Sequence, residues 1–135
     1  MLAQFQHVHR LAALAPGLEQ RLFPGLIDSP VPVTNARGVF SRSLSEFVLA
    51  AILFFAKDLR RMLASQAAAR WEPFEVDEIA GRSVGILGFG DIGRAVAERA
   101  KAMGMRVLAM RRDRSASPEG PFADESFLPE RRLEL

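Results

Sequence analysis

The clearest pattern of hydrophobic and polar positions lies in the second half of the chain. Residues 84–87 form a continuous apolar run of strand length, which is typical of a parallel strand buried on both faces. Apolar residues then recur at helical spacing from Ile92 to Met103, and Gly104 ends the predicted helix. A second apolar run covers residues 106–110. The pattern predicts a strand, a turn, a helix and a second strand, in that order.

A long helix is predicted from Leu44 to about Arg70. Its first half is apolar on nearly every face, so it must be covered on all sides by its own domain or by a partner chain. Ser41 or Ser43 is a suitable N-cap, and Glu46 stands three residues after Ser43, as in a capping box. The single tryptophan, which lies just after the helix, is expected to be a packing anchor.

Short elements are predicted before this helix. Residues 8–15 fit a strand or a frayed helix, and periodicity does not separate the two. A Pro-Gly turn at 16–17 precedes a short helix over residues 18–26, which is predicted to be broken at Pro24. The β-branched residues of the segment 31–34 suit a short edge strand.

The composition is that of a globular protein and limits the possible functions. The 135 residues are 49% hydrophobic and 25% charged, with no cysteine and a net charge of +2. These values exclude general disorder, a disulfide framework and a thiolate metal site. The charge excess is too small to predict nucleic-acid binding. The longest apolar run, residues 47–56, is about half of the roughly 20 residues that a membrane span needs, so no interaction with a membrane is expected. The lack of cysteine indicates a reducing compartment, and a cytoplasmic location is expected.

The turn between the predicted strand and helix reads Gly88-Phe-Gly90-Asp-Ile-Gly93, a G-x-G-x-x-G motif. Gly88 permits the tight turn, Gly90 lets a pyrophosphate approach the backbone, and Gly93 lets the helix pack closely on the sheet. The phosphates would lie on the N–H groups at the positive end of the helix dipole. Glycines alone are weak evidence, but the flanking elements supply the required context. We therefore predict a dinucleotide site rather than a purely structural turn.

The cofactor is predicted to be NADP(H) in preference to NAD(H). An acidic residue at the end of the second strand usually binds the adenosine ribose hydroxyls of NAD. Arg111 and Arg112 occupy that position, and arginine matches a 2′-phosphate through forked, charge-assisted hydrogen bonds. Two alternatives stay open: Arg111, Arg112 and Arg114 form a solvated loop, or Asp113 takes the acidic role.

Several segments around the glycine motif share the order and sequence of one protein family. Residues 31–38 (VPVTNARG) and 43–46 (SLSE), followed by the apolar helix, resemble a crossover from a substrate domain to a nucleotide domain. Residues 70–71 (RW), 81–93 (GRSVGILGFGDIG) and 100–108 (AKAMGMRVL) resemble the start of that nucleotide domain, through its first strand and turn to its second strand. On these segments the chain resembles the D-isomer-specific 2-hydroxyacid dehydrogenases, which include phosphoglycerate dehydrogenase and glyoxylate/hydroxypyruvate reductases.

The resemblance implies hydride transfer between a nicotinamide cofactor and the C2 carbon of a small 2-hydroxy or 2-oxo acid. It also implies that the turn at Gly17 faces the substrate, although Pro16 has no N–H to offer. The helix that begins near Leu44 resembles the one that forms the family's two-fold dimer, so a homodimer is expected. The residues implied to bind the cofactor are Gly88, Phe89, Gly90, Asp91, Ile92, Gly93, Arg111 and Arg112.

The predicted fold class is α/β, a partial doubly wound (Rossmann) nucleotide-binding fold with a remnant of a substrate domain. We expect residues 1–38 to be that remnant, 39–80 the crossover and dimerisation helix with its connection, and 81–135 the first half of the NAD(P)-binding domain. The family's catalytic arginine, glutamate and histidine fall beyond this sequence, so no catalytic residue is assigned and the chain alone is expected to be inactive or nearly so. His7 and His9 match no catalytic or metal motif, so no metal site is predicted.

Two other functions fit the pattern. The first is a non-catalytic module that holds NADP(H) or a full-length homologous subunit. The second is a different Rossmann enzyme, similar to adenosylhomocysteinase. That enzyme class predicts an acidic residue at the end of the second strand and gives no reason for the segment 35–46.

Overall fold

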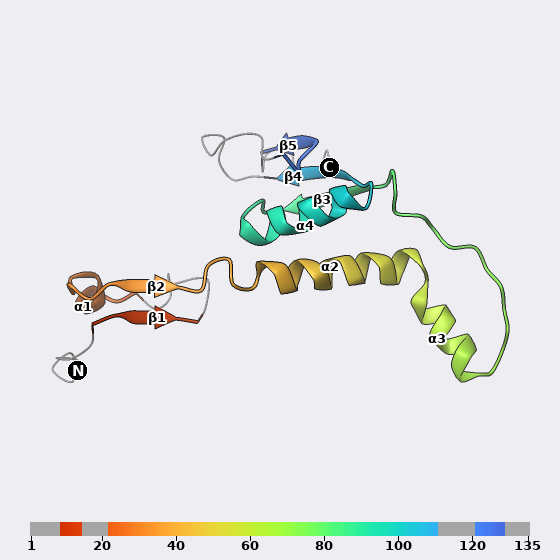
Figure 1. Cartoon of the computed structure of the whole chain (residues 1–135), viewed down its shortest axis with the longest axis horizontal. Coiled ribbons are helices and arrows are strands. Elements are labelled where there is room, and N and C mark those ends of the chain that lie inside the picture. Colours follow the sequence, from red (N-terminus) through yellow and green to blue (C-terminus); the bar gives the residue numbers. More distant parts are fainter. Residues whose placement is uncertain (1–8, 15–21, 111–120, 129–135) are drawn as a thin grey trace. The chain divides into compact units, whose positions relative to one another are not determined.

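The computed structural model of the chain describes residues 9–14, 22–110 and 121–128. The chain consists of two compact units, Met1–Phe40 and Ser41–Leu135. The first unit contains the short elements β1 (Leu11–Ala13), α1 (Pro24–Ile27) and β2 (Val33–Asn35) (Figure 1). Strands β1 and β2 pair in parallel, with Leu11 opposite Val33. The first of the predicted short segments is therefore a strand, and the predicted edge strand near residue 34 is confirmed.

Helix α1 begins at Pro24, so the prediction that this proline breaks a helix is wrong. Proline suits the first helical turn because its φ is already helical and its missing N–H would have no partner there. Phe23, the residue before it, is extended and forms the N-cap. The remaining part of that predicted helix, residues 18–21, lies outside the described residues.

The second unit is an α/β unit built on one parallel sheet. Strand β3 (Ser83–Leu87) pairs with β4 (Arg106–Met110), which pairs with β5 (Glu125–Phe127), and all pairs are parallel. Helix α4 (Asp91–Ala102) connects β3 to β4. The predicted order of strand, turn, helix and strand is confirmed.

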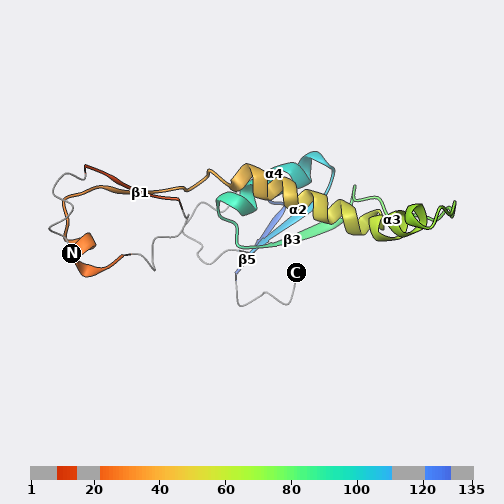
Figure 2. The ribbon, with the colours of Figure 1, turned by 90° about the horizontal axis from the view of Figure 1, so that it is seen from below.

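Helix α2 (Ser41–Ala56) packs on α4, and α4 packs on β3 and β4. Figure 2 shows both helices on the same side of the strands. The core lies between these layers and consists of Leu49, Ile79, Ile86, Phe89, Val96, Ala97, Ala100, Met105, Val107 and Ala109. These side chains hold the turn between β3 and α4 in place.

Strand β3 is buried on one face, whereas the sequence predicted burial on both. Ile86 is buried towards α4, but Leu87 is 71% exposed. Side chains alternate between the two faces of a strand, and among the described elements no helix packs on the face opposite α4. That face of β3 therefore stays open to solvent in the described part of the chain.

The long predicted helix is broken after Ala56, and α3 (Leu59–Ala67) comes next as a separate helix. The break is at Asp58, whose backbone is left-handed with φ 44°. The Asp58 side chain accepts a hydrogen bond from the Arg61 backbone N–H at 3.4 Å, so it caps α3. The prediction of one helix over residues 44–70 is wrong because this cap restarts the helix in a new direction.

The start of α2 also differs from the prediction. The helix begins at Ser41, so Ser43 lies inside it and is not its N-cap. Glu46 pairs with Arg42 at 3.3 Å, one helical turn earlier, and does not complete a capping box with Ser43.

Strand β5 is an element that the hydrophobic pattern did not predict. Its position is fixed by Asp124, which accepts hydrogen bonds from the Val107 backbone N–H at 2.7 Å and from Lys101 Nζ at 2.6 Å. The Lys101 ammonium, and after it the Val107 N–H, lowers the pKa of Asp124 below its ordinary value of 3.8. This carboxylate thus joins β5 to both β4 and α4.

Candidate nucleotide-binding turn

The turn after β3 begins with a glycine in a conformation that other residues rarely adopt. Gly88 has φ +104°, in the range where a Cβ is strained. Its N–H donates a hydrogen bond to the Met110 carbonyl at 3.2 Å. The chain can therefore leave β3 sharply while the turn remains tied to the end of β4.

Gly93 lets α4 approach this turn more closely than any other residue would allow. A Cβ at Gly93 would lie 2.3 Å from the Gly88 carbonyl oxygen and 3.1 Å from Ile86 Cγ2. The first distance is well inside van der Waals contact, and the atom it concerns is backbone. The predicted role of Gly93 in close helix packing is thus visible in the geometry.

Gly90 is the N-cap of α4 and leaves open space above the backbone. A Cβ added at Gly90 would meet no heavy atom of the described residues within 4 Å. The N–H groups of the first helical turn have no partners within their own helix, and the helix dipole is positive at this end. The turn therefore fits the phosphates of a dinucleotide, because a close anion would find backbone donors and no side chain in the way.

The other three residues of the motif differ in exposure. Phe89 is only 7% exposed and packs into the core, so any contact it makes with a ligand would use its backbone. Ile92 is exposed and Asp91 is half-buried. Asp91 also places an acidic side chain in the first turn of α4, which complements the helix dipole but repels a nearby phosphate.

Three of the predicted site residues lie outside the described part of the chain. These are Gly17 of the predicted substrate loop and the two arginines, Arg111 and Arg112, of the predicted 2′-phosphate site. The last described residue before the arginines is Met110, whose carbonyl accepts the Gly88 N–H. Arg111 and Arg112 therefore follow directly in the sequence after Met110, the residue that is hydrogen-bonded to the turn.

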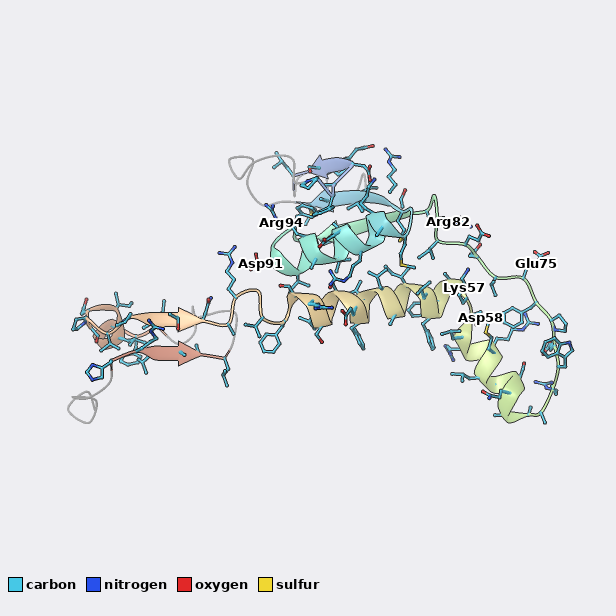
Figure 3. The ribbon with its side chains drawn as sticks, viewed as in Figure 1. Lys57, Asp58, Glu75, Arg82, Asp91 and Arg94 are labelled. Atoms are coloured by element: carbon cyan, nitrogen blue, oxygen red, sulfur yellow. The ribbon has the colours of Figure 1, made fainter. Side chains whose placement is uncertain are left out.

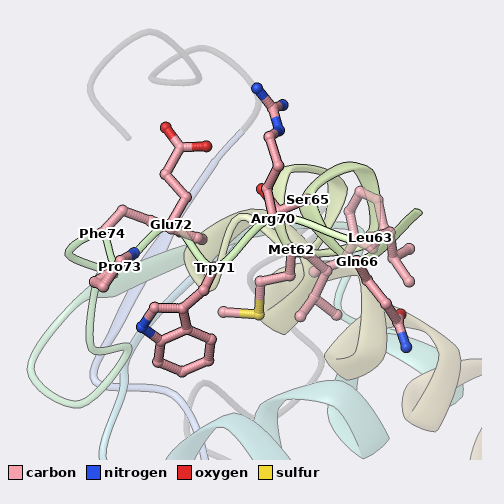
Figure 4. A pocket seen from close by; sticks show the side chains of 11 residues that line it. Met62, Leu63, Ser65, Gln66, Arg70, Trp71, Glu72, Pro73 and Phe74 are labelled. Carbon is pink, nitrogen blue, oxygen red and sulfur yellow. The ribbon is translucent and has the colours of Figure 1, made fainter. Parts of the chain in front are cut away.

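A pocket of about 790 Å³ lies elsewhere in the second unit, along α3 and the segment after it. Figure 4 shows the Trp71 ring beside Met62 in this hollow. Trp71 is 93% exposed, so the expectation that it anchors the core is wrong. The pocket contains none of the glycine-motif residues, and we do not assign the nucleotide to it.

Two features are absent from the segments that the structure describes. These segments contain no group of three histidine or acidic side chains that could hold a metal ion. Of the helices described, none is long and apolar enough to cross a membrane.

Comparisons with known proteins agree with the interpretation of the glycine turn as a nucleotide-binding element. A family model described as the NAD binding domain of D-isomer specific 2-hydroxyacid dehydrogenases matches residues 49–129. A hydroxypyruvate reductase of Thermotoga maritima is 33% identical over 81 residues, which cover 58% of this chain and 26% of that protein. A glyoxylate reductase of Aeropyrum pernix is 31% identical over 137 residues, which cover 93% of this chain and 40% of that protein.

A solved structure shows the same arrangement of elements. It is that of a D-isomer specific 2-hydroxyacid dehydrogenase from Xanthobacter autotrophicus Py2 in complex with NADPH and MES, with 26% identity and a TM-score of 0.71. The match covers 96% of this chain and 40% of that one. The chain thus spans less than half the length of each of these relatives. The parallel sheet and its turn are those of a Rossmann-like NAD-binding domain, which confirms the predicted fold class.

Proposed function

The chain belongs to the D-isomer specific 2-hydroxyacid dehydrogenase family, and we propose that it is the nucleotide-binding part of an enzyme that transfers a hydride between NADP(H) and a small 2-hydroxy or 2-oxo acid. The observation that carries the proposal is the turn itself. Gly93 allows α4 to lie against the Gly88 carbonyl, while the space above Gly90 stays open. When bound, the nicotinamide would give or take the hydride. The chain's own part is to hold the phosphates on the backbone N–H groups of residues 90–92.

The proposed preference for NADP(H) rests on Arg111 and Arg112. Their guanidinium groups would pair with the 2′-phosphate that distinguishes NADPH from NADH. The relative from Xanthobacter autotrophicus, which was solved with NADPH, supports this choice. The test is a fluorescence titration of the chain and of an Arg111→Gln/Arg112→Gln double variant with each cofactor. We expect the double variant to bind NADPH at least about tenfold more weakly and NADH about as before. Equal losses for the two cofactors would overturn the preference.

The proposed substrate class is that of the relatives named as glyoxylate and hydroxypyruvate reductases. Both names refer to reduction of a small 2-oxo acid, a reaction that needs a general acid within hydrogen-bond reach of the substrate oxygen. The chain has two histidines, His7 and His9, and neither matches a catalytic motif of the family. We therefore propose that the 135 residues alone bind the cofactor without turning over substrate. Oxidation of NADPH by the purified chain with glyoxylate, at ordinary enzyme rates, would contradict this. The proposed location of the protein is the cytoplasm.

A second copy of the chain is the proposed partner of α2. Phe47 is 73% exposed and Phe55 is 76% exposed, although both belong to a strongly apolar helix. Exposed apolar patches of this kind mark protein interfaces. A Phe55→Glu variant should therefore have a lower molar mass than the wild type in light scattering after size exclusion. Val39→Glu makes the same kind of change at an exposed position of the first unit and should leave the mass unaltered.

The same apolar face also favours a second candidate function, a non-catalytic module that docks on a longer homologous subunit. The molar mass separates the two candidates. A chain that is monomeric alone and forms a complex only with a full-length relative would support the module, whereas a dimer of the chain alone would support the first proposal.

A further inference from the structure

We propose that Arg94 is a phosphate-binding residue of the dinucleotide site, an inference that rests on the proposed function of the glycine turn. Arg94 lies one turn into α4, and its backbone N–H donates to the Gly90 carbonyl at 2.9 Å. Neither the G-x-G-x-x-G pattern nor the arginine pair after β4 includes it. Figure 3 shows Arg94 near Asp91, at the end of α4 that adjoins the turn.

The position of the guanidinium group is set by the turn. Arg94 Cζ lies 5.6 Å from the centre of the Phe89 ring, and Phe89 stands between Gly88 and Gly90 in the motif. That ring is itself fixed in the core. A cation over an aromatic face is attracted to it, so the flexible arginine side chain is held near the Phe89 ring of the turn while it stays exposed to solvent. Part of the conformational entropy that the Arg94 side chain would lose on binding a phosphate is thus already lost in the free protein.

In the described part of the chain, the guanidinium group of Arg94 keeps hydrogen-bond donors for a ligand. Its side chain is exposed, and none of the described carboxylates forms an ion pair with it. Other arginines of the second unit do pair with carboxylates, among them Arg61, Arg82 and Arg106. A guanidinium group has five N–H donors in a planar fork that matches phosphate oxygens.

The charges around the turn also favour a phosphate-binding role for Arg94. Asp91 brings a carboxylate into the first turn of α4, where a dinucleotide's negatively charged phosphates would lie. Between Ser83 and Glu98, Arg94 is the single cationic residue in the sequence. A positive side chain on the same helical end offsets the repulsion between Asp91 and the ligand.

The test is to neutralise Arg94 and measure cofactor binding at equilibrium. Arg94→Gln removes the charge and keeps a similar length of side chain. Loss of one charge-assisted hydrogen bond to phosphate is expected to weaken binding about tenfold. Arg82→Gln is the matched control, because Arg82 lies just before β3, near the opposite end of α4 from the turn (Figure 3), and its ion pair with Asp77 is exposed. The control should bind the cofactor as the wild type does.

Two cofactors identify the phosphate that is contacted. NADH carries the pyrophosphate alone, and NADPH carries the 2′-phosphate in addition. An equal loss for both cofactors would support a contact with the pyrophosphate, and a loss for NADPH alone would support a contact with the 2′-phosphate. The inference would be overturned if Arg94→Gln bound both cofactors as tightly as the wild type, or if Arg82→Gln lost as much affinity as Arg94→Gln. Either result would leave the proposed function standing. Failure of the wild-type chain to bind either cofactor would instead refute the proposed function.

Discussion

Replacement of Gly93 by alanine tests whether the closeness of α4 to the turn is what builds the site. The added Cβ would lie 2.3 Å from the Gly88 carbonyl oxygen, 3.3 Å from the Gly88 carbonyl carbon and 3.1 Å from Ile86 Cγ2. The Ile86 side chain can rotate by a small amount. The Gly88 carbonyl cannot, because it is backbone between a strand and a helix. The variant therefore has to move the turn and α4 apart.

The expected size of the effect is the balance of two opposing contributions. Overpacking of a buried contact lowers the free energy of unfolding by about 1–3 kcal/mol. Alanine is a better helix former than glycine, and this returns at most about 1 kcal/mol. The 2.3 Å contact is with backbone, so the overpacking cost lies near its upper end and the net loss is expected to be about 2 kcal/mol. Each kcal/mol lowers the Tm of a unit of this size by roughly 4–8 °C.

Gly90→Ala is the matched variant for this experiment. Its Cβ would meet no atom of the described part of the chain within 4 Å, and the residue already has a negative φ of −89°. As a change of N-cap, it lowers the free energy of unfolding by less than about 1 kcal/mol. It should nevertheless weaken NADPH binding, because the methyl group would take space that we assign to the phosphates. Thermal melts and NADPH titrations of both variants give the readouts. A Gly93→Ala chain that melts with the wild type, or a Gly90→Ala chain that binds NADPH equally well, would refute the reasoning.

Two further predictions concern the elements around the site. Asp58→Ala removes the cap of α3 at a left-handed residue and should lower the free energy of unfolding by about 1–2 kcal/mol in urea, whereas Asp58→Asn, which keeps an acceptor and tolerates this backbone, should change it little. Asp124 should make stability fall in acid. Its pKa is lower in the folded chain than in the unfolded one, so its contribution is present above about pH 4 and is lost as the pH falls through the folded pKa. Urea melts of the wild type and Asp124→Asn should therefore differ at pH 6, approach each other below about pH 4 and converge below the folded pKa, and a constant difference would contradict the assignment.

The part of the fold that the sequence predicted correctly is governed by local signals. An apolar run, a glycine in the left-handed region at Gly88 and helical spacing after Gly90 each specify their own structure without help from distant residues. The contact between Gly93 and Gly88 was predictable as well, since the motif itself encodes it. The tight turn at Gly88 and the close approach of α4 at Gly93 could therefore be predicted, whereas the hydrogen bond from the Gly88 N–H to the Met110 carbonyl could not.

The errors arose where local signals are ambiguous or where distant contacts decide. Asp58 interrupts an otherwise continuous helical pattern, and an aspartate can be a solvent-facing helix residue as easily as an N-cap. The three residues of β5 are too few to show a hydrophobic period. The strand is fixed by the hydrogen bond that the Asp124 carboxylate accepts from the backbone N–H of Val107, 17 positions earlier. The exposure of Trp71 depends on what α3 and the segment after it pack against, which no spacing rule contains.

Arg94 is a functional candidate that the motif did not reveal. The available signal was its place one residue after Gly93, as the first cation on a helix whose first turn carries Asp91. Its significance depends on the position of the guanidinium group 5.6 Å from the centre of the Phe89 ring, and a side-chain direction of that kind is set by tertiary structure.

The central claim is that the glycine turn of this chain holds the phosphates of a nicotinamide dinucleotide. A titration of the ¹⁵N-labelled chain with NADPH, monitored by amide chemical shifts, tests it most directly, because the 14.9 kDa chain is small enough for resolved spectra. The account predicts saturable shifts of the amides of residues 88–93, with the indole N–H of Trp71 unchanged. Shifts confined to Trp71 and its pocket, or no saturable shift at the glycine turn, would contradict it.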